Sequence, residues 1–299
     1  VGPQKMNGTN PLGNAGATSV NSTASGANSM KVLQSAHRTE FLKFVNSLKA
    51  SGNTPSHWMF EQADKYMREQ PLDINSPWAS DPGITAEPFL ACRRNYHIMM
   101  TDGRWNSSPS GGSQDNNTVN KTLPDGTVYG STSAATRPNN KLYSDTVSNT
   151  LADWAFRSWA DPLKTTGLTG TMSATAAYLK APATESFGND SAGNPASLDR
   201  FWNPRYNPAT WAHMVTYTIG FSADAVTWPG ASTIVAPTAK VPFGYDGSFP
   251  DLITGNRTWP TMGSEDRRAL DLWHAALNGR GNFYAVNAAA DLEKAFRDI

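Results

Sequence analysis

Histidine and cysteine side chains are the residues of this chain that could bind a soft metal ion or act as acid, base and nucleophile. No two of the five histidines stand at metal-ligand spacing on one predicted element, so we expect no zinc or iron site and no catalytic Cys–His pair. The single cysteine cannot form an internal disulfide, and at the start of an apolar run we expect it to be a buried, unreactive thiol. These residues are His37, His57, His97, His213, His274 and Cys92.

Carboxylates and amides also gather in a polar segment that contains Asp115, Asn116, Asn117 and Asp125. Their oxygens are of the type that Ca²⁺ prefers, but the segment lacks the glycine and the terminal glutamate of the twelve-residue calcium loop. A solvated loop is therefore expected. The chain also has no nucleophile elbow, no phosphate-binding loop and no clustered acid and base motif, so we expect no enzymatic activity.

Two further polar residues stand at the ends of predicted elements. Thr54 precedes Pro55 at the start of a predicted helix, and Asp102 precedes Gly103 at the end of an apolar run. Each has an ordinary structural explanation, because a threonine hydroxyl can cap a helix and an Asp-Gly pair favours a turn. A functional interpretation of either residue needs support from elsewhere in the chain.

The composition limits the class of protein. The 299 residues contain 25 lysines and arginines and 25 acidic residues, so no overall field attracts nucleic acid or an acidic membrane. Only 17% of the residues are charged, and small polar residues are plentiful, as in loop-rich exported proteins. No apolar run is long enough to span a membrane, and no signal peptide stands at Val1, so any targeting segment is expected upstream.

The elements that must position these residues begin after an irregular segment, residues 1–35. Residues 38–49 have helical spacing of Phe41, Leu42, Val45 and Leu48, and a break at 50–53 precedes a second helix that extends to about residue 68. Residues 95–101 form a short apolar run, the pattern of a central strand that is covered on both faces.

Strands and helices alternate from residue 95 to the end. Further strands are predicted at 214–222 and 282–286, with helices at 150–159, 267–278 and 290–298. Such alternation predicts an α/β fold with a doubly wound, mostly parallel sheet flanked by helices, because parallel neighbours need crossover connections. We expect one domain over 36–299, with insertions at about 107–141, 161–212 and 223–262.

Ten tryptophans are many for a chain of this length, and several lie in the inserted passages. Trp202, Trp211, Trp228 and Trp259 stand near prolines or inside irregular segments. Such rings either anchor long loops onto a domain or form a binding face for protein or carbohydrate. Both interpretations stay open from the sequence, with anchoring the more common.

Three motifs occur in an order that resembles the PilC/PilY family of type IV pilus proteins. They are Arg94-Asn95-Tyr96 leading to Met-Thr-Asp-Gly-Arg-Trp-Asn at 100–106, Trp-Ala-His-Met-Val-Thr-Tyr-Thr-Ile-Gly at 211–220, and Asp-Leu-Trp-His-Ala-Ala-Leu-Asn-Gly-Arg-Gly at 271–281. Ser-Gly-Asn-Thr-Pro at 51–55 and Thr101-Asp102-Gly103 also resemble two segments of the metal-ion-dependent adhesion site of von Willebrand factor A domains. The resemblance covers residues from about 36 to the end.

This resemblance implies a von Willebrand factor A-like, Rossmann-like domain without catalytic activity. It implies a bacterial surface or pilus-tip protein, exported through the periplasm and outer membrane, that supports pilus assembly, attachment, surface sensing and twitching motility. Expected partners are minor pilins or other tip proteins, a host or surface ligand, and the remainder of its own longer chain, where the family has a C-terminal β-propeller. Nucleic acid is not an expected partner.

The resemblance also implies a metal site to which Thr54 and Asp102 would contribute. A hydroxyl and a carboxylate suit Mg²⁺, or Mn²⁺ or Ca²⁺, at the carboxyl end of the sheet. The Asp-x-Ser-x-Ser segment that supplies most other ligands is absent from the 299 residues, together with the first strand that should carry it. We therefore expect weak metal binding or none by this chain alone.

Two explanations of the missing segment stay open. Either the chain is truncated, and a strand supplied by another segment completes the sheet, or the site is vestigial and the domain is a structural pilus-tip module that binds partners through its inserted loops. Without this central strand, two unpaired sheet edges and apolar faces would be exposed, so we expect the isolated chain to be unstable.

Overall fold

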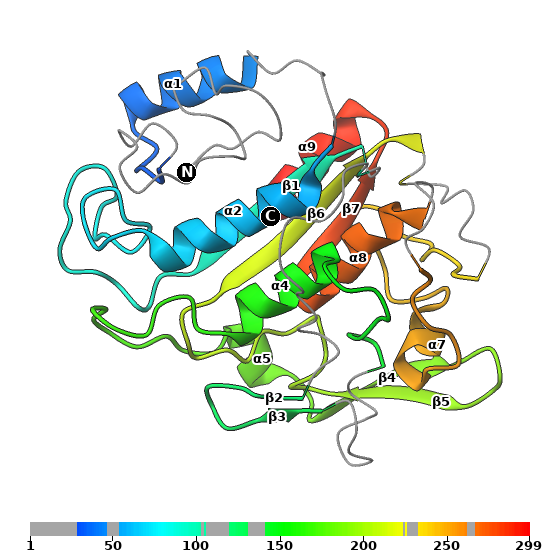
Figure 1. Cartoon of the computed structure of the whole chain (residues 1–299). Coiled ribbons are helices and arrows are strands. Elements are labelled where there is room, and N and C mark those ends of the chain that lie inside the picture. Colours follow the sequence, from blue (N-terminus) through cyan, green and yellow to red (C-terminus); the bar gives the residue numbers. More distant parts are fainter. Residues whose placement is uncertain are drawn as a thin grey trace.

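A computed structural model of the chain describes residues 29–46, 54–102, 105, 120–130, 141–223, 225, 233–261 and 267–299. Its centre is a three-stranded sheet of β1 (Asn95–Thr101), β6 (Met214–Phe221) and β7 (Arg280–Val286), in the order β1-β6-β7 (Figure 1). Both strand pairs are parallel. The predicted α/β class with a parallel sheet is therefore confirmed, and the three predicted strands all lie in this one sheet.

Three helices cover one face of the sheet: α2 (Ser56–Glu69), α4 (Leu151–Ala160) and α8 (Ala269–Asn278) (Figure 1). Every residue of α8 is buried, since it packs between α4 and the strands β6 and β7. The opposite face holds α9 (Ala289–Asp298), whose Ala295 packs with Ile219, Tyr284 and Val286 in a small second core. Helices on both faces make β6 the buried central strand.

Strand β1 differs from its prediction as a central strand. It lies at the sheet edge and buries only the side chains that face α2, such as Met99. On the opposite face Tyr96, Ile98 and Met100 are 48%, 41% and 46% exposed. The apolar run was read as buried on both faces, but among the described residues α9 reaches only β7 and β6, so the prediction was wrong for this face.

The two outer edges of the sheet differ in their backbone hydrogen bonds. The outer edge of β7 is bonded by the segment 240–243, because the Phe243 amide donates to the Phe283 carbonyl and the Ala285 amide donates to the Lys240 carbonyl, at 2.8 and 2.9 Å. In the described part of the chain, no backbone group bonds to the outer edge of β1. One edge is thus protected, and the other is open to another strand.

Close packing between β6 and β7 depends on a glycine. A Cβ atom added at Gly281 would lie 2.1 Å from the Thr216 carbonyl oxygen, which is inside van der Waals contact. The predicted third strand began at residue 282, whereas β7 begins two residues earlier at Arg280. Arg280 and Gly281 therefore belong to the strand, whereas Gly279 caps the helix before it.

The first helix, α1 (Ser35–Asn46), begins three residues earlier than predicted. Leu42 and Val45, two of the residues with helical spacing, are 50% and 44% exposed, while Phe44 is buried. The predicted break that follows lies outside the described residues. No described helix is both long and apolar enough to cross a membrane.

The inserted passages contain short elements that the sequence did not reveal. They are the hairpin β2 (Lys121–Thr122) and β3 (Val128–Tyr129), helix α5 (Ala176–Lys180), the hairpin β4 (Thr184–Asn189) and β5 (Pro195–Asp199), and helix α7 (Phe249–Thr254). The β4–β5 hairpin packs on α7, so two passages separated by the central strand β6 meet at one side of the domain (Figure 1).

Buried tryptophans anchor these passages. Trp159 of α4 donates its indole N–H to Asn207, and Trp211 donates to the Trp159 carbonyl, at 3.1 and 2.7 Å. Trp259 donates to the Leu142 carbonyl at 2.8 Å and stacks on His274. For these three rings the anchoring interpretation is confirmed, whereas Trp228 lies outside the described residues.

The Arg280 guanidinium lies in an aromatic cage inside the core. Its carbon lies 4.8 Å from the Tyr143 ring centroid, 4.2 Å from Trp159 and 5.7 Å from Trp202. One nitrogen, Nη1, donates to the Tyr143 hydroxyl, while Nε and Nη2 are buried without a hydrogen bond. The ring faces stabilise the buried cation through cation–π attraction, which is stronger where water is excluded.

Candidate functional site

The carboxyl end of β1 presents an acidic side chain to solvent. Asp102 directly follows the strand, and its Oδ1 accepts a hydrogen bond from the Thr101 hydroxyl at 3.3 Å. The Ser222 hydroxyl, just beyond β6, donates to the Asp102 backbone carbonyl at 2.7 Å. The ends of two neighbouring strands therefore hold an exposed carboxylate among hydroxyl groups, at the sheet edge where parallel α/β proteins bind ligands.

The start of α2 lies beside the same edge. Its N-cap is Pro55, so partly buried Thr54 stands just before the helix. The ring of His57, three residues beyond Thr54, packs edge-on against the ring of Trp105, three residues beyond Asp102, with centroids 4.2 Å apart. The structure thus brings together the two elements that carry the predicted ligands. The preceding residues 51–53 lie outside the described chain.

A fully buried carboxylate lies beneath this edge. Asp271, in the first turn of α8, accepts hydrogen bonds from the backbone amides of Leu151 and Ala152 at 2.9 and 3.2 Å. These amides are the first of α4, and the His57 Nε2 lies 3.5 Å from the Asp271 Oδ2. Asp271 therefore caps another helix, where a negative charge is favoured by the helix dipole. Its place in the first turn of α8 would by itself indicate only an interaction with the dipole of its own helix.

The donors at the edge suit a hard divalent cation in type. Asp102 offers a carboxylate, and Thr54, Thr101 and Ser222 offer hydroxyl oxygens. Their number is small, because Mg²⁺ takes about six oxygens and binds through one or two carboxylates with several waters. Among the described residues, no three His, Cys, Asp or Glu side chains form a group that could hold a metal. Asp102 and Thr54 would therefore hold an ion only together with water or further ligands.

The histidines occupy separate structural positions. His213 accepts at Nε2 from Asn207, whose own oxygen already receives the Trp159 and Ala209 donors, so the imidazole must be neutral. Burial lowers the pKa of His213 to about 4, and burial likewise lowers that of His97 to about 4. Buried His274 lies 3.4 Å from an Asp145 oxygen. His97, His213 and His274 thus lie at separate places in the fold.

Cys92 departs from its prediction. Its thiol is exposed, because the residue lies in the loop before β1 and not within the apolar strand. The prediction of a buried thiol was therefore wrong.

The polar loop that resembled a calcium site is described only in part. Asp115, Asn116 and Asn117 lie outside the described residues, while Asp125 is exposed and accepts the Thr127 amide at 3.0 Å in a turn.

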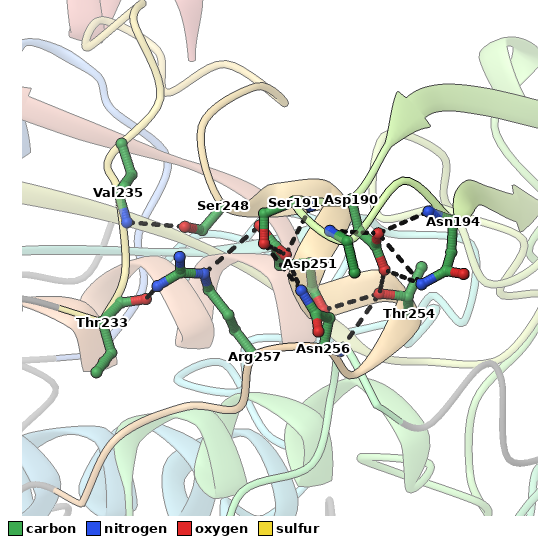
Figure 2. A network of polar contacts seen from close by, with 11 residues as sticks. Asp190, Ser191, Asn194, Thr233, Val235, Ser248, Asp251, Thr254, Asn256 and Arg257 are labelled. Carbon is green, nitrogen blue, oxygen red and sulfur yellow. Dashed lines mark hydrogen bonds and ion pairs between the residues drawn. The ribbon is translucent and has the colours of Figure 1, made fainter.

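A second polar cluster lies where the β4–β5 turn meets α7 (Figure 2). The Asp190 carboxylate accepts the Asn194 amide at 2.8 Å, the Asn194 side chain at 3.1 Å and the Thr254 hydroxyl at 2.8 Å. Burial raises the pKa of Asp190, but these hydrogen bonds lower it by more, so the net pKa is below the ordinary value. An ionised carboxylate thus ties the hairpin to the helix.

Asp251 of α7 is the centre of the adjoining part of this cluster (Figure 2). Its Oδ1 accepts the Ser191 amide and hydroxyl at 3.0 and 2.6 Å and the Asn256 side chain at 2.6 Å. Burial raises the pKa of Asp251, but these hydrogen bonds and the charge of Arg257 lower it by more, so the net pKa is below the ordinary value. The Arg257 Nε lies 3.6 Å from Asp251 Oδ2, and its Nη1 donates to the Thr233 carbonyl. Sequence spacing carried no signal for this cluster, because its members come from separate passages.

Comparison with known proteins relates the chain to curated pilus proteins. It is 34% identical over 269 residues to the type IV pilus biogenesis factor PilY1 of Pseudomonas aeruginosa strain PAK, and 33% identical over 279 residues to that of strain PAO1. These alignments cover 88% and 91% of this chain, but the chain spans only about a fifth of the relatives' length, 20% and 21%. No family model matches the chain, and no solved structure does either.

Proposed function

Because the chain belongs to the PilC/PilY family, we propose that it serves type IV pilus assembly and surface adhesion by binding partners, not by catalysis. The observation that supports this most is the family relationship over nearly the whole chain, which extends to the third relative at 30% identity over 94% of the chain. The relatives are named as biogenesis factors, and the proposed location is correspondingly outside the cell, at the pilus or cell surface.

The proposed ligand contact is the carboxyl edge of the sheet. The Asp102 carboxylate there is exposed and accepts from the Thr101 hydroxyl, and the Ser222 hydroxyl bonds the Asp102 backbone carbonyl, in a place where an added divalent ion could bridge to an acidic group of a partner. Thr54 and Asp102 would hold Mg²⁺, Mn²⁺ or Ca²⁺ with other ligands, and the ion would supply the charge that attracts a carboxylate. Within these 299 residues the proposed affinity is weak.

Calorimetric titration of the full-length protein with Mg²⁺ and with Mn²⁺ tests the metal site. Binding is expected in the native protein and in Asp125→Ala, which removes an exposed aspartate from a distant turn, but not in Asp102→Ala. Equal binding by both variants would overturn the assignment of Asp102. Absence of binding in every protein would favour the alternative function, a structural tip module with a vestigial site and partner contacts through its inserted loops.

Pilus assembly is tested separately. Cells that carry Asp102→Ala should lose attachment and keep surface pili if the metal site serves adhesion alone, and they should lose both if it serves assembly. Normal pilation and normal attachment in that strain would remove the metal site from the proposed function. The measurements are pilin recovered from sheared cells and the number of cells retained on a coated surface.

The open edge of β1 supports a further part of the proposal, a strand from elsewhere in the same protein. The strand lacks a bonded outer neighbour in the described chain, and Tyr96, Ile98 and Met100 expose an apolar face that parallel sheets normally cover. The relatives are about five times longer than this chain, since it spans 20–22% of them, so they contain other segments that could supply the strand. Minor pilins and other tip proteins are the proposed outside partners.

Denaturant unfolding tests this part of the proposal. The isolated 299 residues should unfold with low cooperativity or associate, whereas the full-length protein should protect β1 amides from hydrogen exchange. A single cooperative transition by an isolated monomer would show that no added strand is needed.

A further inference from the structure

A polar pocket of about 540 Å³ opens beside the Asp251 cluster. Its walls come from four separate places: Ser191 in the β4–β5 turn, Thr233, the segment 256–261 after α7, and Arg267 just before α8. This volume lies in the range of about 300–1,000 Å³ that is usual for small-molecule sites. The pocket is separate from the Asp102 edge and shares no residue with it.

The pocket is positively charged. Arg257 and Arg267 line it, and no acidic residue does so in the described part of the chain. Asp251 offsets the charge of Arg257, but its contact is with one nitrogen: the Asp251 Oδ2 lies 3.6 Å from the Arg257 Nε, and its Oδ1 accepts three other hydrogen bonds. Figure 2 shows the guanidinium held on two sides, by Thr233 and Asp251, with its third nitrogen directed away from both. That nitrogen can donate to an anion.

Neutral hydrogen-bonding groups surround the two arginines. Asn256 donates from its nitrogen to Asp251 and to the Ser191 hydroxyl at 2.6 and 2.9 Å, which leaves its side-chain oxygen as an acceptor. The Thr258 side chain adds a hydroxyl that can donate and accept. The ring of Trp259 is buried against Trp273 and His274, and no aromatic side chain lines the pocket among the described residues. Charge, not ring stacking, must therefore supply the affinity.

We propose that this pocket binds an acidic saccharide, a sugar ring that carries a carboxylate. Arg257 and Arg267 line the same pocket, and each guanidinium suits a carboxylate in charge and in planar geometry, because arginine can donate to both oxygens of such a group. The Thr258 hydroxyl can donate to and accept from the hydroxyls of the ring, and the side-chain oxygen of Asn256 can accept from them. The Ser191 hydroxyl can only accept, because its proton is donated to Asp251. A bare inorganic anion would leave these groups unused, and a neutral sugar would leave the arginines unpaired.

Calorimetry or saturation-transfer NMR on the full-length protein tests the proposal, with galacturonate as ligand and galactose as its neutral counterpart. EDTA in every titration excludes divalent ions, so the outcome does not depend on the proposed metal site. Galacturonate should bind and galactose should not, and salt should weaken the binding. The Arg257→Gln and Arg267→Gln variants should each bind about tenfold or more weakly, since each lacks a charge-assisted hydrogen bond. Arg297→Gln, on the exposed face of α9, should bind normally.

The proposal would be overturned by no binding of galacturonate, by equal binding of galactose, or by equal binding of acetate or inorganic phosphate. Undiminished binding by both pocket variants would do so as well. Because either substitution could disturb the fold, the thermal midpoint of each variant is compared with that of the native protein. If one variant unfolds, the other still decides the result, because the two arginines come from different segments.

Discussion

Arg280 and Arg257 are two arginines whose guanidiniums lack a full set of hydrogen bonds, and their surroundings differ completely. Arg280 is 6% exposed and enclosed by the rings of Tyr143, Trp159 and Trp202. Arg257 has a side chain that is 33% exposed and faces a polar pocket. The missing hydrogen-bond partners therefore have a different explanation in each region. In the sealed region the aromatic faces replace them, whereas in the open region a ligand can supply them.

Electrostatics differ between the two regions in the same way. Burial disfavours the charged form of both groups, because it lowers the pKa of Arg280 and raises that of Tyr143 to about 12. In the open region, hydrogen bonds hold Asp190 and Asp251 ionised beside solvent. We expect changes in the sealed region to alter stability, and changes in the open region to alter binding.

The largest expected effect is that of Arg280→Ala. This substitution leaves a cavity among three aromatic rings and removes their cation–π contacts, so the free energy of unfolding should fall by about 3–5 kcal/mol. Arg257→Ala should change it by less than about 1 kcal/mol, because that ion pair is long and partly exposed. Chemical unfolding of both variants, followed by tryptophan fluorescence, gives the two values. Similar losses for both would show that the comparison is wrong.

Acid should act next most strongly, and on the sealed region. The pKa values of His97 and His213 are about 4 in the folded protein, below the ordinary value of about 6.5, so unfolding takes up protons in acid. Stability is therefore fully present above about pH 6.5 and falls towards pH 4, by roughly 3–4 kcal/mol for the pair between pH 7 and pH 5.

The measurement is the unfolding free energy at several pH values. In His97→Phe the loss between pH 7 and pH 5 should be about half as large, because only His213 then contributes. A loss unchanged in the double variant His97→Phe/His213→Gln would assign the acid sensitivity to other groups.

Asp271→Asn is expected to cost about 2 kcal/mol, less than either change above. An asparagine has one oxygen instead of two, so one of the Leu151 and Ala152 amides at the start of α4 would face an N–H₂ group. The negative charge at the helix N-terminus would also be lost. Thermal unfolding measures the effect, and hydrogen exchange of the first α4 amides locates it. Unchanged exchange at these amides would contradict a capping role.

The smallest stability effect is expected for Asp251→Asn, about 1 kcal/mol, since the remaining side-chain oxygen still accepts from Ser191. Binding should respond in the opposite direction. Removing a negative charge 3.6 Å from Arg257 should strengthen galacturonate binding several-fold, an order-of-magnitude expectation for a charge close to a partly exposed arginine. Calorimetry at low salt measures this change. Weaker binding of galacturonate would mean that Asp251 also positions Arg257, in addition to offsetting its charge.

The sequence alone determined the elements of the core and their class. Apolar periodicity located β1, β6 and β7 and the helices α2, α4, α8 and α9, because the spacing of apolar residues along the sequence reflects which face of a strand or helix is buried. It also located Thr54 and Asp102 at the ends of α2 and β1. Local spacing does not specify which face of an edge strand finds a cover, and so β1 was assigned two covered faces in error.

The tertiary structure decided which distant residues meet. Asp271 caps a helix whose first residue is 120 positions away, and Asp251 binds Ser191 across 60 positions. Arg280 lies in its aromatic cage only because α4 and two other passages of the chain fold over β7. Such contacts are invisible in local patterns, because a hydrogen bond or a ring contact depends on the packed positions of whole elements, and many sequences with the same periodicity would place different side chains there.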